Sequence, residues 1–114
     1  MTFLRVLLVA MLVTLVIYTG FAIVNDGPFF FAIAAGDVAA LGWPGQFNLD
    51  FVCYLILSAI WVAWRHKFSM IGIGLGLIAS VGGIIFLSIY LLIASYRANG
   101  DVREILLGEQ MVSN

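Results

Sequence analysis

Three long apolar runs constrain this chain more than any other feature of its sequence. They cover residues 3–24, 47–64 and 71–96. A helix needs about 20 apolar residues to cross about 30 Å of hydrocarbon, and it satisfies its own backbone hydrogen bonds there. Only 10% of the residues are charged, against about 25% in a soluble domain. The sequence therefore predicts an all-α fold, a transmembrane bundle of three helices within one integral membrane domain, residues 1–114.

The first run has a rival interpretation as a cleaved signal peptide. The run is longer than the apolar region of a signal peptide, which has about 7–15 residues, and no clear small-residue cleavage site follows it. The sequence therefore favours an uncleaved first helix.

Two shorter segments complete the expected fold. Residues 29–41 are apolar, but as a helix they would span only about 20 Å, so we expect an interfacial or re-entrant helix in the first loop. In the tail, residues 97–114, Asp101 and Glu104 have the spacing of a capping box. This spacing predicts a short C-terminal helix that lies on the membrane.

The basic residues predict an orientation. Arg5 precedes most of the first helix, and Arg65 and Lys67 lie between the second and the third, whereas the first loop has two aspartates and no Lys or Arg. The positive-inside rule then places the amino terminus and the basic turn in the cytoplasm, and the carboxyl terminus outside. Two further arginines in the tail count against this orientation. The expected location is the bacterial cytoplasmic (inner) membrane.

Polar residues within the apolar runs form a candidate intramembrane cluster. Residues three and four apart share a helix face, so Asp50 and Tyr54 share one, and Asn48 would be the N-cap just before them. Estimated depths bring residues of the other two helices to the same level. The predicted cluster is Asp50, Tyr54, Tyr18 and Tyr90, with Arg97 above it. Asp50 either stabilises the helix start and bonds to tyrosines or serves as an ion or proton site, and its charge state stays open.

The third helix carries a face of small residues. Small residues spaced four apart let helix backbones approach closely. The face serves either packing within the monomer or docking of a second copy or another membrane protein. Its members are Gly72, Gly76, Ser80 and Gly83.

Aromatic and basic residues near the helix ends are expected to anchor the chain at the membrane interface. A pigment or quinone site is the rival interpretation, but belt residues of this kind are commoner. His66 is expected to contact headgroups, because no second histidine is present to ligate haem. The expected anchors are Trp43, Trp61, Trp64, Arg65 and Lys67.

The sequence resembles a family of small bacterial three-helix membrane proteins that is catalogued as a domain of unknown function. The resemblance rests on Gln-Phe-Asn-Leu-Asp at 46–50, the apolar helix that ends at Arg-His-Lys, 65–67, and the glycine-rich third helix that ends at Tyr-Arg, 96–97. Here Asp50 is followed by Phe51, and the family's acidic residue before the basic pair is missing. The resemblance implies topology and no activity.

The expected function is that of an accessory or structural subunit that binds membrane lipid and another membrane protein, or a second copy of itself. The alternative is an oligomeric transporter or channel with Asp50 as the intramembrane site. An enzyme is not expected, because no nucleophile and base, phosphate loop, cofactor motif or metal constellation is visible. A net charge of −1 makes nucleic acid an unexpected partner.

Overall fold

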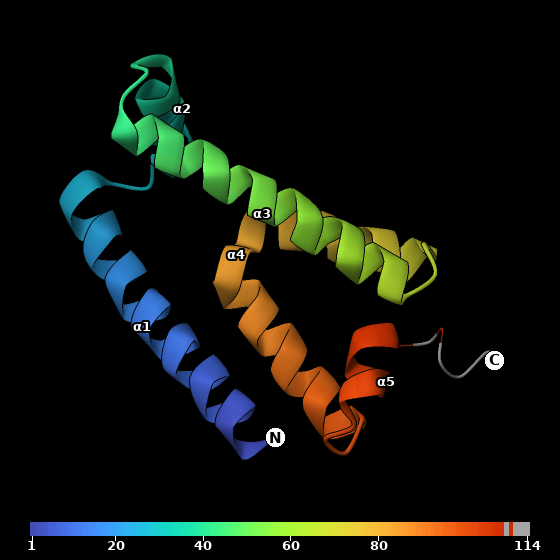
Figure 1. Ribbon diagram of the computed structural model, residues 1–114. Helices are drawn as coiled ribbons and strands as arrows, with labels where there is room; N and C mark the ends of the chain where they lie inside the picture. The colour runs from blue at the N-terminus through green and yellow to red at the C-terminus, as the bar shows by residue number, and fades with distance from the viewer. Residues whose placement is uncertain (109, 111–114) are drawn as a thin grey trace.

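A computed structural model describes residues 1–108 and 110 as an arrangement of helices (Figure 1). The fold is all-α, as predicted, and no strand occurs within the described ranges. The helices α1, α3 and α4 are long and apolar enough to cross a membrane, by length and composition. In chain order the elements are α1 (Thr2–Asp26), α2 (Phe30–Ala39), α3 (Trp43–Arg65), α4 (Met70–Arg97) and α5 (Val102–Leu107).

The helix α4 is the centre of the packing. It contacts α3 along its first part, and it also packs against α1 and α5, whereas α2 packs on α3. In Figure 1, α1 and α3 diverge from the end of the molecule that carries α2, and α1 runs alongside the second half of α4. The amino-terminal helix is therefore joined to the rest of the protein chiefly through α4.

The helix α3 begins earlier than the sequence predicted. It starts at Trp43, with Pro44 in its first turn, where a missing N–H costs no hydrogen bond. Asn48 therefore lies inside the helix, so its predicted role as the N-cap is wrong. Its side-chain amide instead donates to the Asp37 carboxylate at 3.2 Å and to the Pro44 carbonyl at 3.0 Å. These bonds join α3 to α2.

A glycine allows α2 and α3 to lie close together. Gly45 is buried, and a Cβ atom at this position would overlap the backbone of Asp37. The two helices thus form a tight hairpin, which agrees with the expected short helix in the first loop.

The helix α4 is sharply kinked at Gly83, whose φ of 58° and ψ of −146° are not helical. Such a positive φ favours glycine, which has no Cβ to clash. The kink turns the chain back toward the end of α3. Both Gly72 and Tyr90 lie against His66, although eighteen residues of straight helix would separate them by about 27 Å. Each half of α4 is roughly 20 Å long.

The start of α1 and the end of α4 meet at one end of the molecule. The Cβ of Met1 lies 3.5 Å from the position that a Cβ on Gly100 would occupy, and the Arg5 side chain bonds to Ser95 at 3.0 Å. The sequence placed these two ends on opposite faces of the membrane. In the structure the two ends are instead in contact, and the cause is the kink at Gly83.

The tail contains the predicted short helix, α5. Asp101 is its N-cap, and its carboxylate accepts a hydrogen bond from the Arg103 backbone N–H at 3.0 Å. Ile105 is 4% exposed. The helix therefore packs against the protein, and its predicted position on the membrane surface stays a prediction.

Candidate functional site

The small-residue face of α4 packs within the monomer. A Cβ on Gly76 would lie 2.9 Å from the Ala59 carbonyl oxygen and 3.4 Å from the Ala63 Cβ. A Cβ on Gly72 would lie 2.6 Å from the Cβ of His66. Of the two uses that the sequence left open, the structure gives these two glycines the internal one, as the contact between α3 and α4.

The other two members of the face lie near the kink. The Ser80 hydroxyl donates to the Leu77 carbonyl at 2.6 Å, within its own helix. A Cβ on Gly83 would lie 3.2 Å from the ring of Phe51 on α3. The kink therefore abuts the amino-terminal half of α3.

Arg65 joins three helices at the basic end of the molecule. From the last turn of α3, its Nε donates to the Ile105 carbonyl of α5 at 2.6 Å, and its Nη1 donates to the Tyr90 hydroxyl of α4 at 2.9 Å. A longer contact of 3.5 Å runs from Nη2 to the Glu104 carbonyl. The planar guanidinium suits this role, because its donors point in fixed, different directions. Arg65 thus holds α5 against α3 and α4.

Tyr90 is the second member of this basic-end cluster. Its hydroxyl lies 2.7 Å from His66 Nε2, and its ring packs edge-on against Trp61 and stacks on Phe86. His66 is half-buried. The sequence had placed Tyr90 beside Asp50 and had exposed His66 to headgroups, and both placements are wrong.

The distance along α3 from Asp50 to Arg65 excludes a contact between Tyr90 and Asp50. Fifteen residues separate Asp50 from Arg65, which corresponds to about 22 Å of helix. The depth argument had assumed a straight α4, whereas the kink at Gly83 carries Tyr90 back to Arg65.

The expected interface anchors divide into two groups. Trp43 is 82% exposed, and Trp64 and Lys67 are also exposed, so all three can reach headgroups. Trp61 is half-buried, and its Nε1 donates to the Leu106 carbonyl of α5 at 3.2 Å. Trp61 therefore helps Arg65 to hold α5.

Arg5 forms a second polar contact, between α1 and α4. Its Nε donates to the Ser95 hydroxyl and its Nη2 to the Ser95 carbonyl, each at 3.0 Å. Its Cζ lies 3.9 Å from the centre of the Tyr96 ring. The sequence analysis gave no role to Ser95. The one indication in the sequence was its place as a serine in an otherwise apolar run, two residues before Arg97.

The predicted cluster around Asp50 does not assemble. Asp50 and Arg97 are exposed, Tyr54 is 68% exposed and Tyr18 is 72% exposed. Within residues 1–108 and 110, no hydrogen bond or ion pair reaches the Asp50 carboxylate. Asp50 and Tyr54 nevertheless lie one turn apart on the outer face of α3, as the helical spacing predicted.

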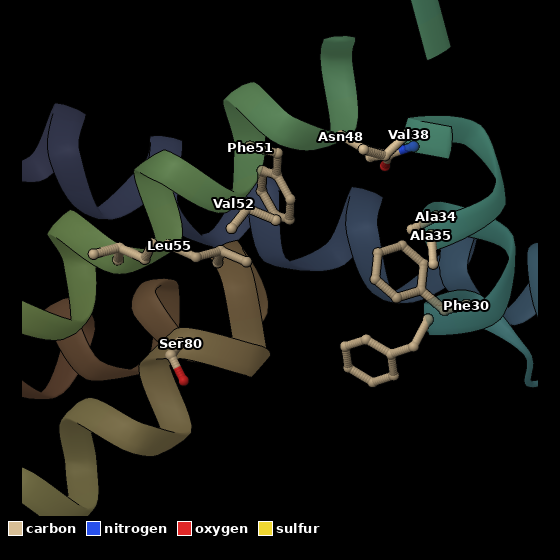
Figure 2. Close-up of a pocket in the computed structure, with 11 residues that line it drawn as sticks. Phe30, Ala34, Ala35, Val38, Asn48, Phe51, Val52, Leu55 and Ser80 are labelled. Carbon is tan, nitrogen blue, oxygen red and sulfur yellow. The ribbon is translucent and has the colours of Figure 1, made fainter. Parts of the chain in front are cut away.

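Two apolar cavities flank α3. One, of about 280 Å³, lies between α2 and α3, where Phe30 and Ala34 face Phe51 and Leu55, and Ser80 of α4 completes the lining (Figure 2). The other, of about 290 Å³, lies at the kink and has Tyr54 in its wall. Their apolar linings suit hydrocarbon groups.

The basic residues of the chain gather at one end of the molecule. All the Lys and Arg residues lie at the end where α1 begins and where α3 and α4 end: Arg5, Arg65, Lys67, Arg97 and Arg103. Asp26 and Asp37 lie at the opposite end, at the close of α1 and in α2.

Comparisons with known protein families, curated proteins and solved structures found no match to this chain.

Proposed function

We propose that this protein is an accessory subunit of a bacterial cytoplasmic membrane that docks to another membrane protein through the outer face of α3. The observation that carries the proposal is the exposure of Asp50 and Tyr54 on a helix that is long and apolar enough to cross a membrane. No residue in the described part of the chain bonds to the Asp50 carboxylate.

The cost of leaving Asp50 in lipid supports a docked state. A charged side chain at the centre of a membrane helix costs about 2.5–3.5 kcal/mol on insertion scales. A partner helix that supplies a donor or a cation would remove much of this cost, and Tyr54 would provide a second polar contact one turn away. The glycine face of α4 is not the docking surface in this proposal, because α3 already covers Gly72 and Gly76.

The proposed orientation follows from the clustering of the basic residues at one end. The positive-inside rule places that end in the cytoplasm. In this arrangement α1 and α3 cross the membrane, and α4 enters from the cytoplasmic side and returns to it, with Gly83 at its tip. The roughly 20 Å length of each half of α4 supports this arrangement, because about 30 Å of hydrocarbon must be crossed.

An oligomeric transporter or channel is the second candidate, and the same exposed carboxylate favours it. Several copies with their α3 faces turned inward would bring their Asp50 side chains around one axis. In that case the docking partner is the chain itself.

The test compares Asp50→Leu with Asp26→Asn, which removes the same charge at the acidic end of α1. Each tagged protein is purified in mild detergent, and the mass of the native complex and the identity of its members are measured. We expect Asp50→Leu to release the partner without loss of helical content, and Asp26→Asn to retain it. Undiminished binding by Asp50→Leu would refute docking through this face. A complex that contains only this chain, with proton flux in vesicles that Asp50→Asn abolishes, would favour the transporter.

A further inference from the structure

We propose that the groove between the start of α1 and the end of α4 binds one anionic phospholipid, with its phosphate on the Arg5 guanidinium. This site lies at the basic end of the molecule and is separate from the α3 face around Asp50.

The first support is the way in which Arg5 is held. A guanidinium has five N–H donors in a rigid plane. Two of them are bonded to Ser95, and the face of the group lies on the Tyr96 ring, so the group is fixed in place before any ligand arrives. Its Nη1 donors have no acceptor in the described part of the chain, and no carboxylate there pairs with Arg5. A fixed cation with free donors matches a phosphate oxygen.

The second support is the shape and chemistry of the space beside Arg5. A cavity of about 540 Å³ opens there, between the first turns of α1 and the last turns of α4. Thr2, Arg5 and Tyr96 supply its polar wall, and Val6, Val9 and Leu92 supply its apolar wall. Because Val6 and Val9 lie farther along α1 than Arg5, the polar part is at the helix end and the apolar part extends inward. An amphiphile with a charged head and a hydrocarbon tail fits this order.

The third support is the position and sign of the surrounding charge. Arg5 lies within the first two turns of α1, which places it at headgroup depth when α1 crosses the membrane. Five basic residues gather at this end, against Asp101 and Glu104 among the described residues. Basic pockets between membrane helices at this level attract anionic headgroups. The net negative charge of the lipid, rather than its phosphate alone, is therefore the feature that the site selects.

The experiment uses the full chain, purified in a neutral detergent and freed of lipid. Phosphatidylglycerol, phosphatidylcholine with the same acyl chains, and inorganic phosphate are titrated separately. Native mass spectrometry counts the bound molecules, and thermal unfolding reports stabilisation. We expect one phosphatidylglycerol to bind, phosphatidylcholine to bind about tenfold more weakly, and inorganic phosphate to have no effect. A tenfold change corresponds to about 1.4 kcal/mol.

Three variants assign the site. Arg5→Gln keeps an amide donor toward Ser95 but removes the charge, and Val9→Trp fills the apolar wall but keeps Arg5. We expect each to weaken phosphatidylglycerol binding about tenfold. The matched control is Arg97→Gln, which removes one charge from the same end at an exposed residue outside the groove, and its binding should stay within about twofold of the parent.

Several results would overturn the proposal. Equal binding of the two lipids would show that the site does not select lipids by their net charge. Stabilisation by inorganic phosphate would show that the groove binds a free ion rather than a lipid. An equal loss of phosphatidylglycerol binding in Arg97→Gln and Arg5→Gln would show that the lipid is attracted by the general positive charge of this end rather than bound at a site. If Arg5→Gln does not fold, Val9→Trp decides the question, and unchanged binding by that variant would exclude the groove.

Discussion

A single methyl group at Gly76 tests the contact between α3 and α4. A Cβ there would lie 2.9 Å from the Ala59 carbonyl oxygen and 3.4 Å from the Ala63 Cβ. Ordinary van der Waals contact begins at 3.4 Å, so Gly76→Ala requires α3 and α4 to separate by roughly half an ångström. Overpacking of this kind costs about 1–3 kcal/mol.

The chain offers a matched control two residues away. Gly74 lies on the same helix, and a Cβ there would meet nothing within 4 Å. Both Gly→Ala changes gain helix propensity, about 0.8–1.0 kcal/mol each. The difference between the two variants therefore isolates the steric cost, and we expect Gly76→Ala to be less stable than Gly74→Ala by about 1–3 kcal/mol.

The measurement is the unfolding free energy of both variants in mixed micelles, titrated with a denaturing detergent and followed by circular dichroism. The parent protein provides the reference. Equal stabilities, or a Gly76→Ala protein that is the more stable of the two, would show that α3 and α4 do not pack through this face.

Two further predictions concern the basic end. Tyr90→Phe removes the hydroxyl that bonds to Arg65 and His66, and we expect it to lower the unfolding free energy by about 1–2 kcal/mol. The control, Tyr54→Phe, changes an exposed tyrosine and should leave the unfolding free energy unchanged. Equal stabilities of the two variants would refute the basic-end cluster. Green fluorescent protein fused to the carboxyl terminus should fluoresce, and alkaline phosphatase fused there should be inactive. The reason is that the end of α4 meets the amino terminus at the basic end, which is the proposed cytoplasmic side. Active phosphatase would contradict the re-entrant arrangement of α4.

The helices that the sequence predicted correctly are those that apolar length and local caps determine. The bounds of α1 and α4 follow from the apolar runs, and the N-cap of α5 follows from Asp101. The start of α3 was predicted too late, because the apolar run begins only at residue 47, although Trp43 and Pro44 before it belong to the helix and proline suits a first helical turn.

The basic-end cluster of Arg65 and Tyr90 could not be predicted, because it depends on the backbone conformation of Gly83. A straight helix and a helix kinked at Gly83 have the same apolar pattern, and α4 contains several glycines that give no indication of which one bends. The depth comparison therefore placed Tyr90 about 22 Å from its true partner, Arg65. The prediction that Asp50 and Tyr54 share a face succeeded because it needed only the spacing within one helix.

The hydrogen bonds between Arg5 and Ser95 join residues that are 90 positions apart in the chain. Ribosomes add about 5–20 residues per second, so Ser95 is made roughly 5–20 seconds after Arg5. During synthesis α1 therefore enters the bilayer without its principal neighbour, and its arginine must be solvated by headgroups and water in the meantime. Assembly of α1 onto α4 is then a late step that occurs within the membrane, and a chain truncated before Ser95 should insert α1 without fixing its position.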